Sequence, residues 1–252
     1  YLTFSNQFDV TLFKKLVLTA VYDYRQRDNL FKYRNNTFEY SRQQGVVETF
    51  TSGSVENSYR EIHQTYKGHH VNIYGTYENS WGGHNLKITA GGQYEDYRST
   101  SLDAKQTDLS SDDIDSFTVA TGPITLSQSI TAYRTLGFFG RVNYDYKGRY
   151  IFEASARGDG SSRFARSTRW GNFWSVGASW RMSQEAFMRD ISWLNNLTLK
   201  FSYGVQGNNS VGSYYAYQAL YDTGSPNATL PGATINDVAN EDLTWESNHN
   251  LN

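Results

Sequence analysis

Four charged side chains around one short turn are the first candidates for chemistry in this sequence of 252 residues. Arg141 precedes the turn at Lys147-Gly148, and Glu153, Arg157 and Asp159 follow it at alternating positions. Guanidinium and carboxylate groups on one polar face can hold a polar ligand through charge-assisted hydrogen bonds. They can equally form a structural ladder, because opposite charges facing each other across two strands attract. Their positions leave both roles open.

Aromatic residues gather in a second place, a polar stretch that reads YYAYQALY. Tyr214, Tyr215 and Tyr217 carry flat rings that can stack on sugars or contact a partner protein. Rings in one loop also pack on one another, and the sequence does not separate these alternatives. We count the three tyrosines with the four charged residues as candidate ligand-binding residues.

Metal and nucleophile chemistry find little support. The acidic run DLSSDDID at 108–115 offers oxygen ligands of the kind calcium prefers, but it lacks the glycine and final glutamate of an EF-hand loop, which favours a solvated loop. His63, His69 and His70 have no carboxylate at the helical spacing of a metal site. Ser161-Ser162 lacks the Gly-x-Ser-x-Gly turn of a hydrolase. We predict no metal, no cofactor and no catalytic residue.

The elements that position these residues are predicted to be strands, because apolar and polar residues alternate with a period of two. In the middle of the chain, Leu136, Phe138 and Val142 share one face, and Arg141 lies on the other. The same alternation predicts about seven strands and the start of an eighth near Trp245. They lie at 16–26, 71–78, 84–95, 135–145, 150–159, 173–181 and 197–206.

The turn between the two central strands suggests a register. Pairing Asp145 with Arg149 leaves the three-residue loop Tyr146-Lys147-Gly148, whose final glycine suits the left-handed position of such loops. This register places two further pairs opposite each other, Val142 with Phe152 and Arg141 with Glu153. Stretch 46–66 is less regular: it either extends the second strand or forms a hairpin about Ser52-Gly53.

Connection lengths alternate along the chain. They are short at 79–84 and 146–148, and the middling 182–196 contains Gln184, Glu185, Phe187 and Met188, which indicate one helical turn. Long polar loops are expected at the other strand ends, at 27–57, 98–133, 160–171 and 207–244. Outer-membrane β-barrels alternate short periplasmic turns with long extracellular loops. A soluble sandwich shares the alternation of faces, but the connection lengths favour the barrel.

Composition narrows the class further. Aromatic residues make up 16% of the chain, with 20 Tyr and 21 Gly, although mean hydropathy is only −0.64. A net charge of −2 offers no footprint for nucleic acid, and the absence of cysteine excludes a disulfide scaffold. No apolar run approaches the length of a transmembrane helix. The start, YLTFSNQFDV, has neither an initiator Met nor a signal peptide, which suggests a fragment.

A series of spaced motifs carries a family resemblance. Residues 141–188, RVNYDYKGRYIFEASARGDGSSRFARSTRWGNFWSVGASWRMSQEAFM, closely resemble the signature region of the SusC/RagA family of TonB-linked outer-membrane transporters. Similar agreement is found in HNLKITAGGQYE at 84–95, WLNNLTLKFSYGVQGNN at 193–209 and NEDLTWESNHNLN at 240–252. Residues 1–83 resemble the family only weakly.

The resemblance implies a barrel of about 22 strands that encloses an N-terminal plug. It also implies a TonB box and a SusD-like surface lipoprotein. Plug, TonB box and C-terminal strands are not recognisable here. We therefore predict that 1–252 is an all-β, antiparallel transmembrane β-barrel segment of about seven to eight strands with long extracellular loops.

The function implied by the resemblance is uptake of oligosaccharides or peptides. Import would cross the outer membrane of a Gram-negative bacterium, with the SusD-like lipoprotein, TonB and outer-membrane lipid as partners. Such a barrel is not an enzyme, because it moves its substrate without covalent chemistry. The alternative from another class is a soluble all-β glycan-binding module.

Overall fold

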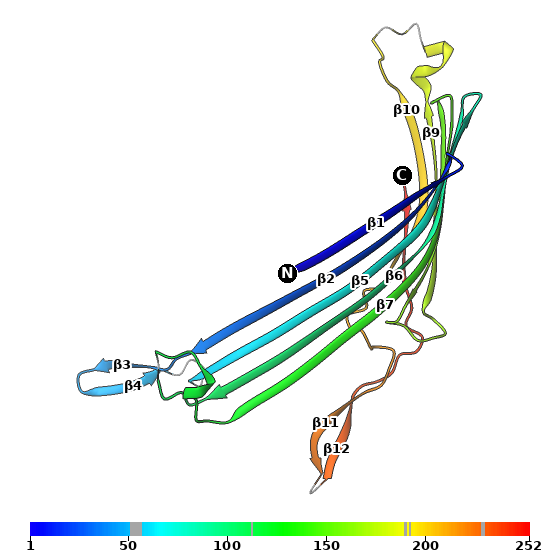
Figure 1. Ribbon diagram of the computed structural model, residues 1–252. Helices are drawn as coiled ribbons and strands as arrows, with labels where there is room; N and C mark the ends of the chain where they lie inside the picture. Colours follow the sequence, from blue (N-terminus) through cyan, green and yellow to red (C-terminus); the bar gives the residue numbers. More distant parts are fainter. Residues whose placement is uncertain (51–56, 112, 189–190, 192, 228–229) are drawn as a thin grey trace. The chain divides into compact units, whose positions relative to one another are not determined.

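The structure is a computed structural model that describes residues 1–50, 57–111, 113–188, 191, 193–227 and 230–252. Over these residues nine strands form one sheet in the order β1-β2-β5-β6-β7-β8-β9-β10-β13 (Figure 1). Neighbours in the sheet follow each other along the chain except where a two-stranded sheet, β3-β4 or β11-β12, intervenes. The all-β prediction is therefore confirmed.

The strands vary twofold or more in length. Those of the main sheet are β1 (Leu2–Leu12), β2 (Leu16–Asn35), β5 (Ser58–Trp81), β6 (His84–Thr107), β7 (Ile124–Tyr146), β8 (Tyr150–Ser161), β9 (Trp170–Arg181), β10 (Thr198–Asn208) and β13 (Glu246–Leu251). The small sheets contain β3 (Phe38–Gln43), β4 (Val46–Phe50), β11 (Leu220–Asn227) and β12 (Leu230–Asp237). Short 3-10 helices span Phe117–Val119, Met182–Gln184 and Ala186–Met188. The last two confirm the helical turn predicted before residue 196.

Two features of the predicted strand map need correction. Residues 2–12 form β1, although the alternation of apolar and polar residues predicted no strand there. The expected loop at 98–133 is shorter, because β6 continues to Thr107 and β7 begins at Ile124. The expected loop at 27–57 is shorter in the same way, because β2 continues to Asn35 and the hairpin β3-β4 follows. Backbone pairing persists beyond the point where the apolar alternation fades, since a ladder needs hydrogen-bonding partners and not an apolar face.

The ambiguous stretch 46–66 adopts neither predicted arrangement in full. β4 pairs with β3, and the positive φ of Gly45 (85°) lies in the turn between them. β5 then begins at Ser58. The proposed turn residues Ser52-Gly53 lie outside the described residues.

The turn between β7 and β8 corrects the predicted register. Asp145 pairs with Ile151 and not with Arg149. Lys147 and Gly148 both have positive φ, 53° and 67°, so the left-handed stretch begins before the glycine and the loop ends one residue later than predicted. The pairing shifts by two residues, which leaves every side chain on its predicted face.

The chain forms two compact units, which we call the first and the second unit. The first contains Tyr1–Thr3, Arg25–Lys67 and Arg98–Ala132, and the second contains Phe4–Tyr24, Gly68–Tyr97 and Tyr133–Asn252. Strands β1, β2, β5, β6 and β7 contribute residues to both. Among the described residues, no helix is long and apolar enough to cross a membrane.

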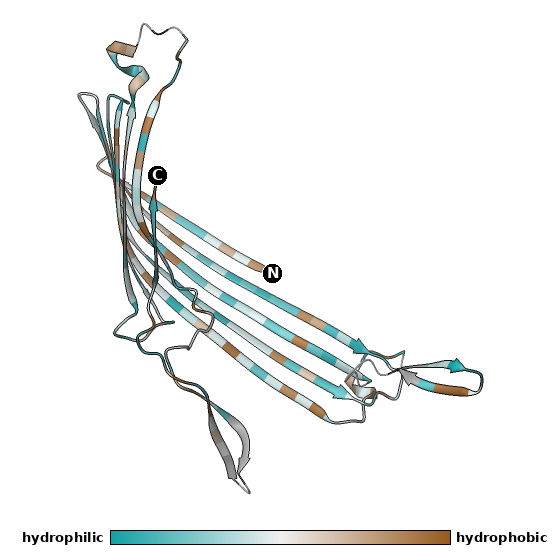
Figure 2. Cartoon of the chain, turned by 180° about the vertical axis from the view of Figure 1, so that it is seen from behind, coloured by the Kyte–Doolittle hydropathy of each residue, from teal (hydrophilic) through white to brown (hydrophobic). Residues whose placement is uncertain are grey.

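The second unit has one apolar and one polar face, and hydropathy alternates along its strands (Figure 2). The apolar side chains are exposed: Ile73 is 60% exposed and Phe138 is 58% exposed. Cross-strand pairs keep this face continuous, since Phe152 pairs with Ala178 and Ala178 with Phe201. A large exposed apolar face requires a non-aqueous neighbour.

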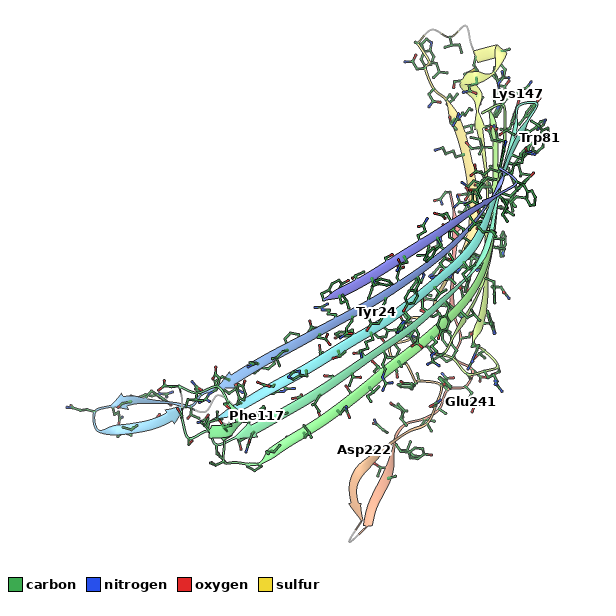
Figure 3. The ribbon with its side chains drawn as sticks, viewed as in Figure 1. Tyr24, Trp81, Phe117, Lys147, Asp222 and Glu241 are labelled. Carbon is green, nitrogen blue, oxygen red and sulfur yellow. The ribbon has the colours of Figure 1, made fainter. Side chains whose placement is uncertain are left out.

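An aromatic belt borders the apolar face at the short turns, and we call it the turn-end belt. Its rings follow one another at centroid distances of 4.6 to 6.5 Å in the order Trp81, His84, Tyr146, Tyr150, Trp180. Glu185 fixes part of the belt, because its Oε1 accepts from Tyr150 Oη at 2.7 Å and from Trp180 Nε1 at 3.2 Å. Lys147 lies over the Tyr146 ring, at the same end as Trp81 in Figure 3.

A second set of rings, the loop-end belt, borders the same face on the side away from the short turns, within β2, β5 and β7 and at the start of β9. It contains Tyr22, Tyr24, His69, Phe138 and Trp170, with centroid contacts of 5.0 to 6.4 Å. Trp170 and Trp180 lie ten residues apart on β9, which is about 33 Å along a strand. At the tilt of barrel strands this corresponds to about 25 Å, the height of the apolar band of a membrane barrel.

The first unit has its own small core. Tyr59 is only 2% exposed and packs edge-on against Phe117, which is labelled in Figure 3, at a centroid distance of 4.9 Å. The backbone N–H of Asp108 donates to the Asn57 carbonyl at 2.9 Å, and Arg34 Nη2 donates to the Ser111 carbonyl at 2.9 Å. These contacts fold the acidic segment back onto the strands. The segment is therefore held by hydrogen bonds at the ends of β5 and β6.

Candidate functional site: the polar face

The polar face of the second unit carries the predicted charged residues. Arg141 Nη2 lies 2.7 Å from Glu153 Oε2, although the residue opposite Arg141 is Ser155. The ion pair is thus diagonal, which long side chains permit. Both side chains remain about half exposed, 52% and 41%, so the pair contributes little to stability and stays accessible to a ligand.

Arg157 and Asp159 form a second, tighter cluster. Arg157 Nε donates to both carboxylate oxygens of Asp159, at 2.8 and 2.6 Å, and its Nη2 donates to Gln93 Oε1 at 3.1 Å. Gly137 makes room for this cluster, since a Cβ at that position would overlap Asp159 Oδ1. Asp159 is 9% exposed. This arrangement favours the structural ladder for Arg157 and Asp159 more than for Arg141 and Glu153.

A shallow groove of about 420 Å³ runs between Glu153 and Arg157 on β8 and residues of β9, β10 and β13. Its floor consists of small residues, with Ser155 Oγ and Ser175 Oγ 2.7 Å apart and Gly177 beside them. Glu153 and Arg157 stand on one side of it. A groove with a small polar floor and charged borders can accept a polar group, which places Glu153 and Arg157 at a common site.

A polar chain that the sequence reasoning missed runs from β1 to β5. Ser5 Oγ donates to Asp23 Oδ1, and His70 Nδ1 lies 3.1 Å from Asp23 Oδ2. The carboxylate lies between the hydroxyl and the imidazole, whereas a nucleophilic triad places the imidazole between the other two. The chain therefore has the residues of a triad in an order that does not activate the serine.

The predicted tyrosines do not act as one cluster. Tyr214 stacks on Tyr133 at 5.6 Å, and the guanidinium of Arg163 lies 4.5 and 4.4 Å from the two ring centroids. Arg163 Nη1 also donates to the Asn209 carbonyl at 3.2 Å. Tyr214 is therefore engaged in packing, which is the structural alternative left open by the sequence.

Tyr217 lies apart from Tyr214, in a shallow groove of about 770 Å³. Arg166 and Glu241 also line this groove, and the Tyr217 hydroxyl accepts from Gln218 Nε2 at 2.7 Å. Tyr215 does not line it, although all three tyrosines are half-buried. Of the three tyrosines, Tyr217 keeps the best access to a ligand.

An aromatic core around Phe164 packs the connection between β8 and β9 against the segment before β13. Its side chain is fully buried and lies 5.6 Å from the Trp245 ring, which also contacts Phe173 at 5.3 Å. Trp245 Nε1 donates to the Arg169 carbonyl at 2.8 Å. This core ties the β8–β9 connection to the segment before β13, and it fixes the ends of the strands that carry Arg157 and Asp159.

Residues missed by the sequence reasoning complete the polar face. Gln93 and Asp23 lie on the polar faces of strands that the alternation already predicted. The face of each residue could therefore be predicted from the sequence, but its hydrogen-bonding partners could not. Arg163 and Phe164 fall within the quoted signature region but follow no alternation. Within the described residues, no group of three His, Cys, Asp or Glu side chains could hold a metal ion.

Comparison with known proteins identifies the class. The sequence profile of the family described as TonB dependent receptor-like, beta-barrel matches residues 1–252, and the chain belongs to this family. In such barrels the apolar face meets lipid and the polar face lines the interior. Family membership replaces the alternative of a soluble glycan-binding module.

The most informative relatives are longer proteins of the same kind. The chain is 33% identical over 185 residues to the TonB-dependent receptor SusC of Bacteroides thetaiotaomicron, which covers 69% of this chain and 18% of the relative. It is 36% identical over 122 residues to the TonB-dependent receptor P39 of Formosa agariphila, covering 48% of this chain and 12% of that one. The chain thus spans less than a fifth of the length of these curated relatives.

Solved structures agree with this assignment. A chain of the RagAB peptide transporter superposes with a TM-score of 0.81 at 25% identity, over 98% of this chain and 27% of that one. The RagAB peptide importer in its "open-open" state gives 0.80 over 99% and 26%. The protein is therefore a SusC- and RagA-like β-barrel segment, as the resemblance of the sequence indicated.

Proposed function

We propose that the chain forms part of the wall of an outer-membrane importer in a Gram-negative bacterium. Import of oligosaccharides or peptides would proceed with a SusD-like lipoprotein and with force supplied through TonB. The wall carries no covalent step in this proposal. Its residues line the path of the substrate and hold the barrel in the membrane.

The observation that carries the proposal is the division of the second unit into two faces. The apolar face is bounded by two aromatic belts about 25 Å apart, which suits one bilayer. The opposite face carries accessible charges, with the Arg141–Glu153 pair and the groove beside Glu153 and Arg157. A surface with lipid on one side and hydrated charges on the other suits the wall of a transport channel.

Strand length supports the proposed orientation. Strands β5 and β6 have 24 residues each, whereas about ten residues suffice to cross the membrane. Their short connection at Gly82 and Gly83 suits a periplasmic turn, and their opposite ends would then stand outside the cell. The segment that contains Asp113 is accordingly assigned to the extracellular side.

Labelling of the full-length transporter tests location and orientation together. In a cysteine-free background, Asp113→Cys should react with a membrane-impermeant maleimide on intact cells. Lys14→Cys, in the turn between β1 and β2, serves as the matched control and should react only after the outer membrane is permeabilised. The reverse pattern would invert the topology, and recovery of the protein outside the outer-membrane fraction would overturn the proposed location.

The role of the polar face in the substrate path is tested by neutralising its charged side chains in a barrel that still folds. Arg141→Gln with Glu153→Gln should lower uptake of labelled peptides or oligosaccharides several-fold by cells that express the full-length protein. Glu78→Gln with Lys87→Gln removes another ion pair of the polar face, at 2.6 Å, and is the control. Equal uptake by both double variants, at equal folded yield, would reduce Arg141 and Glu153 to a structural ladder.

A further inference from the structure

Two exposed cations follow the apolar face just beyond the loop-end belt. Lys67 lies two residues from His69 on β5, and Arg98 lies six residues from Gly92 on β6, where an added Cβ would lie 3.4 Å from the belt residue Phe138. Even spacing along a strand places both side chains on the same face as the belt. They are therefore the first lysine or arginine of β5 and β6 on this face beyond the belt; Asp96, two residues before Arg98 on the same face, pairs with Arg134 at 2.7 Å.

The ladder between β5 and β6 places these cations opposite each other. Contacts toward both ends of the ladder share one register, and in this register Lys67 faces Arg98. These contacts are Thr76–Thr89 at 3.3 Å, Ser80–Asn85 at 2.7 Å and Asp108 N–H to the Asn57 carbonyl at 2.9 Å. Like charges directly opposite each other on one face are destabilising.

No acidic side chain among the described residues forms an ion pair with either cation. Asp28 on β2 interacts electrostatically with Lys67 without forming an ion pair. Its carboxylate instead accepts hydrogen bonds from Gln26 at 2.7 Å and from Thr65 at 2.8 Å. Arg98 takes part in no ion pair in the described part of the chain. Neither positive charge is therefore neutralised by an ion pair within the described residues.

We propose that Lys67 and Arg98 bind the phosphate group of a lipid in the outer leaflet. The proposal rests on the outer-membrane location proposed above, which puts these residues just past the loop-end belt, where cationic side chains appear on this face of β5 and β6. A phosphate monoester supplies the negative charge that the pair lacks. Lys and Arg are the side chains that most commonly hold phosphate through charge-assisted hydrogen bonds.

The test is titration of the purified full-length transporter with lipid A, followed by native mass spectrometry. Each cation near an anionic lipid surface contributes about fivefold to affinity, so Lys67→Gln and Arg98→Gln should each raise the Kd about fivefold and the double variant about 25-fold. Dephosphorylated lipid A should bind the parent protein as weakly as lipid A binds the double variant. Competition by inorganic phosphate at equal concentration should be weak, since the acyl chains hold the lipid.

Two further variants separate binding from folding. Arg25→Gln removes an exposed charge from the polar-face side of β2 and should leave the Kd unchanged. Arg98→Glu should form an ion pair with Lys67 and raise resistance to urea, while abolishing lipid A binding. An unchanged Kd in the double variant would overturn the lipid site. If the protein is still found in the outer membrane, the proposed function survives that result.

Discussion

One sheet contains the short strands β8 and β9 and the long strands β5 and β6, and only the long strands extend past the apolar face. Strands β8 and β9 have 12 residues each and expose aromatic and aliphatic side chains on one face. Strands β5 and β6 have twice that length, and their first-unit parts carry charges on both faces. Glu61 pairs with Lys32 at 3.4 Å on one face, and Arg60 pairs with Asp103 on the other.

This comparison shows that backbone pairing and membrane insertion obey different limits. An antiparallel ladder can continue for as long as each strand has a neighbour. The apolar face, in contrast, is restricted to the thickness of the hydrocarbon core. Where β5 and β6 pass that limit, charged side chains appear on both faces while the hydrogen-bonded ladder continues. The chemical boundary therefore lies within the strands and not at their ends.

The largest expected effect concerns buried packing in the second unit. Phe164→Ala removes a fully buried ring from its contact with Trp245 and should cost about 3–5 kcal/mol of unfolding free energy. Phe31→Ala in the first unit is the control, because its side chain is 40% exposed, and should cost less than about 1 kcal/mol. Urea unfolding of the full-length protein measures both. Similar losses would mean that the two units are equally well packed at these positions.

The next largest effect is expected when an arginine is placed on the lipid-facing side of the second unit but not of the first. Ala154 pairs with Val142 and Val176 on the apolar face, so Ala154→Arg should cost about 2–4 kcal/mol near the middle of the membrane. Leu102 lies on the same face of the sheet, on β6, but in the first unit. Leu102→Arg should therefore change the free energy of unfolding by no more than about 0.5 kcal/mol. Heat-modifiable gel mobility of the folded barrel reports the difference.

The polar-face control for this substitution is Ser155→Arg, which is adjacent in sequence but points to the interior. It loses the 2.7 Å contact with Ser175 and should lower folded yield much less than Ala154→Arg. A greater loss from Ser155→Arg, without overlap with a plug, would reverse the assignment of the faces.

Two glycines of β7 sharpen the difference between the faces of the second unit. A Cβ at Gly137 would overlap Asp159 Oδ1, so Gly137→Ala should cost about 1–3 kcal/mol by forcing apart the Arg157–Asp159 cluster. A Cβ at Gly140 meets no atom within 4 Å, and Gly140→Ala should be neutral or stabilising by less than about 1 kcal/mol. Equal urea midpoints for the two variants would show that Asp159 can move at no cost.

Periodicity predicted the faces correctly, because the period of two follows from strand geometry alone. It missed the extra length of β5 and β6, since residues such as Lys67 and Arg98 break the apolar pattern without breaking the ladder. The register error arose at Lys147, whose positive φ is uncommon for a residue other than glycine. The diagonal Arg141–Glu153 pair survived that error because long side chains reach across a two-residue shift.

The contacts of the candidate site were less predictable than its orientation. Arg157 and Asp159 were chosen from the sequence, but their third partner, Gln93, lies 64 residues away on β6. The Tyr214 contact with Arg163 depends on how the loop after β10 folds back, which no local pattern encodes. Family resemblance identified the class of protein, but only the packed side chains separated the accessible Tyr217 from the engaged Tyr214.

Acid should weaken the first unit before the second, and this is the smallest expected effect. The Arg60 hydrogen bond lowers the pKa of Asp103, and the Tyr59 hydroxyl, followed by Lys32, lowers the pKa of Glu61. A carboxylate whose pKa is lower in the folded state stabilises that state above its unfolded pKa, near 4, and this contribution is lost as pH falls through the folded pKa. Each exposed pair contributes less than about 1 kcal/mol, so only local opening is expected.

Hydrogen–deuterium exchange of the full-length protein at pH 6 and pH 3, corrected for intrinsic rates, measures that opening. Peptides from 58–67 and 98–107 should lose protection at pH 3, whereas peptides from 150–161 should change little, because their ladder is shielded by lipid on one face. Asp103→Asn removes a titrating group and should reduce the pH dependence of the first two peptides, since the amide stays neutral over this range. If 150–161 responded to acid as strongly as 58–67, the two regions would share one solvent on both faces, and the chemical boundary within the strands would have to be abandoned.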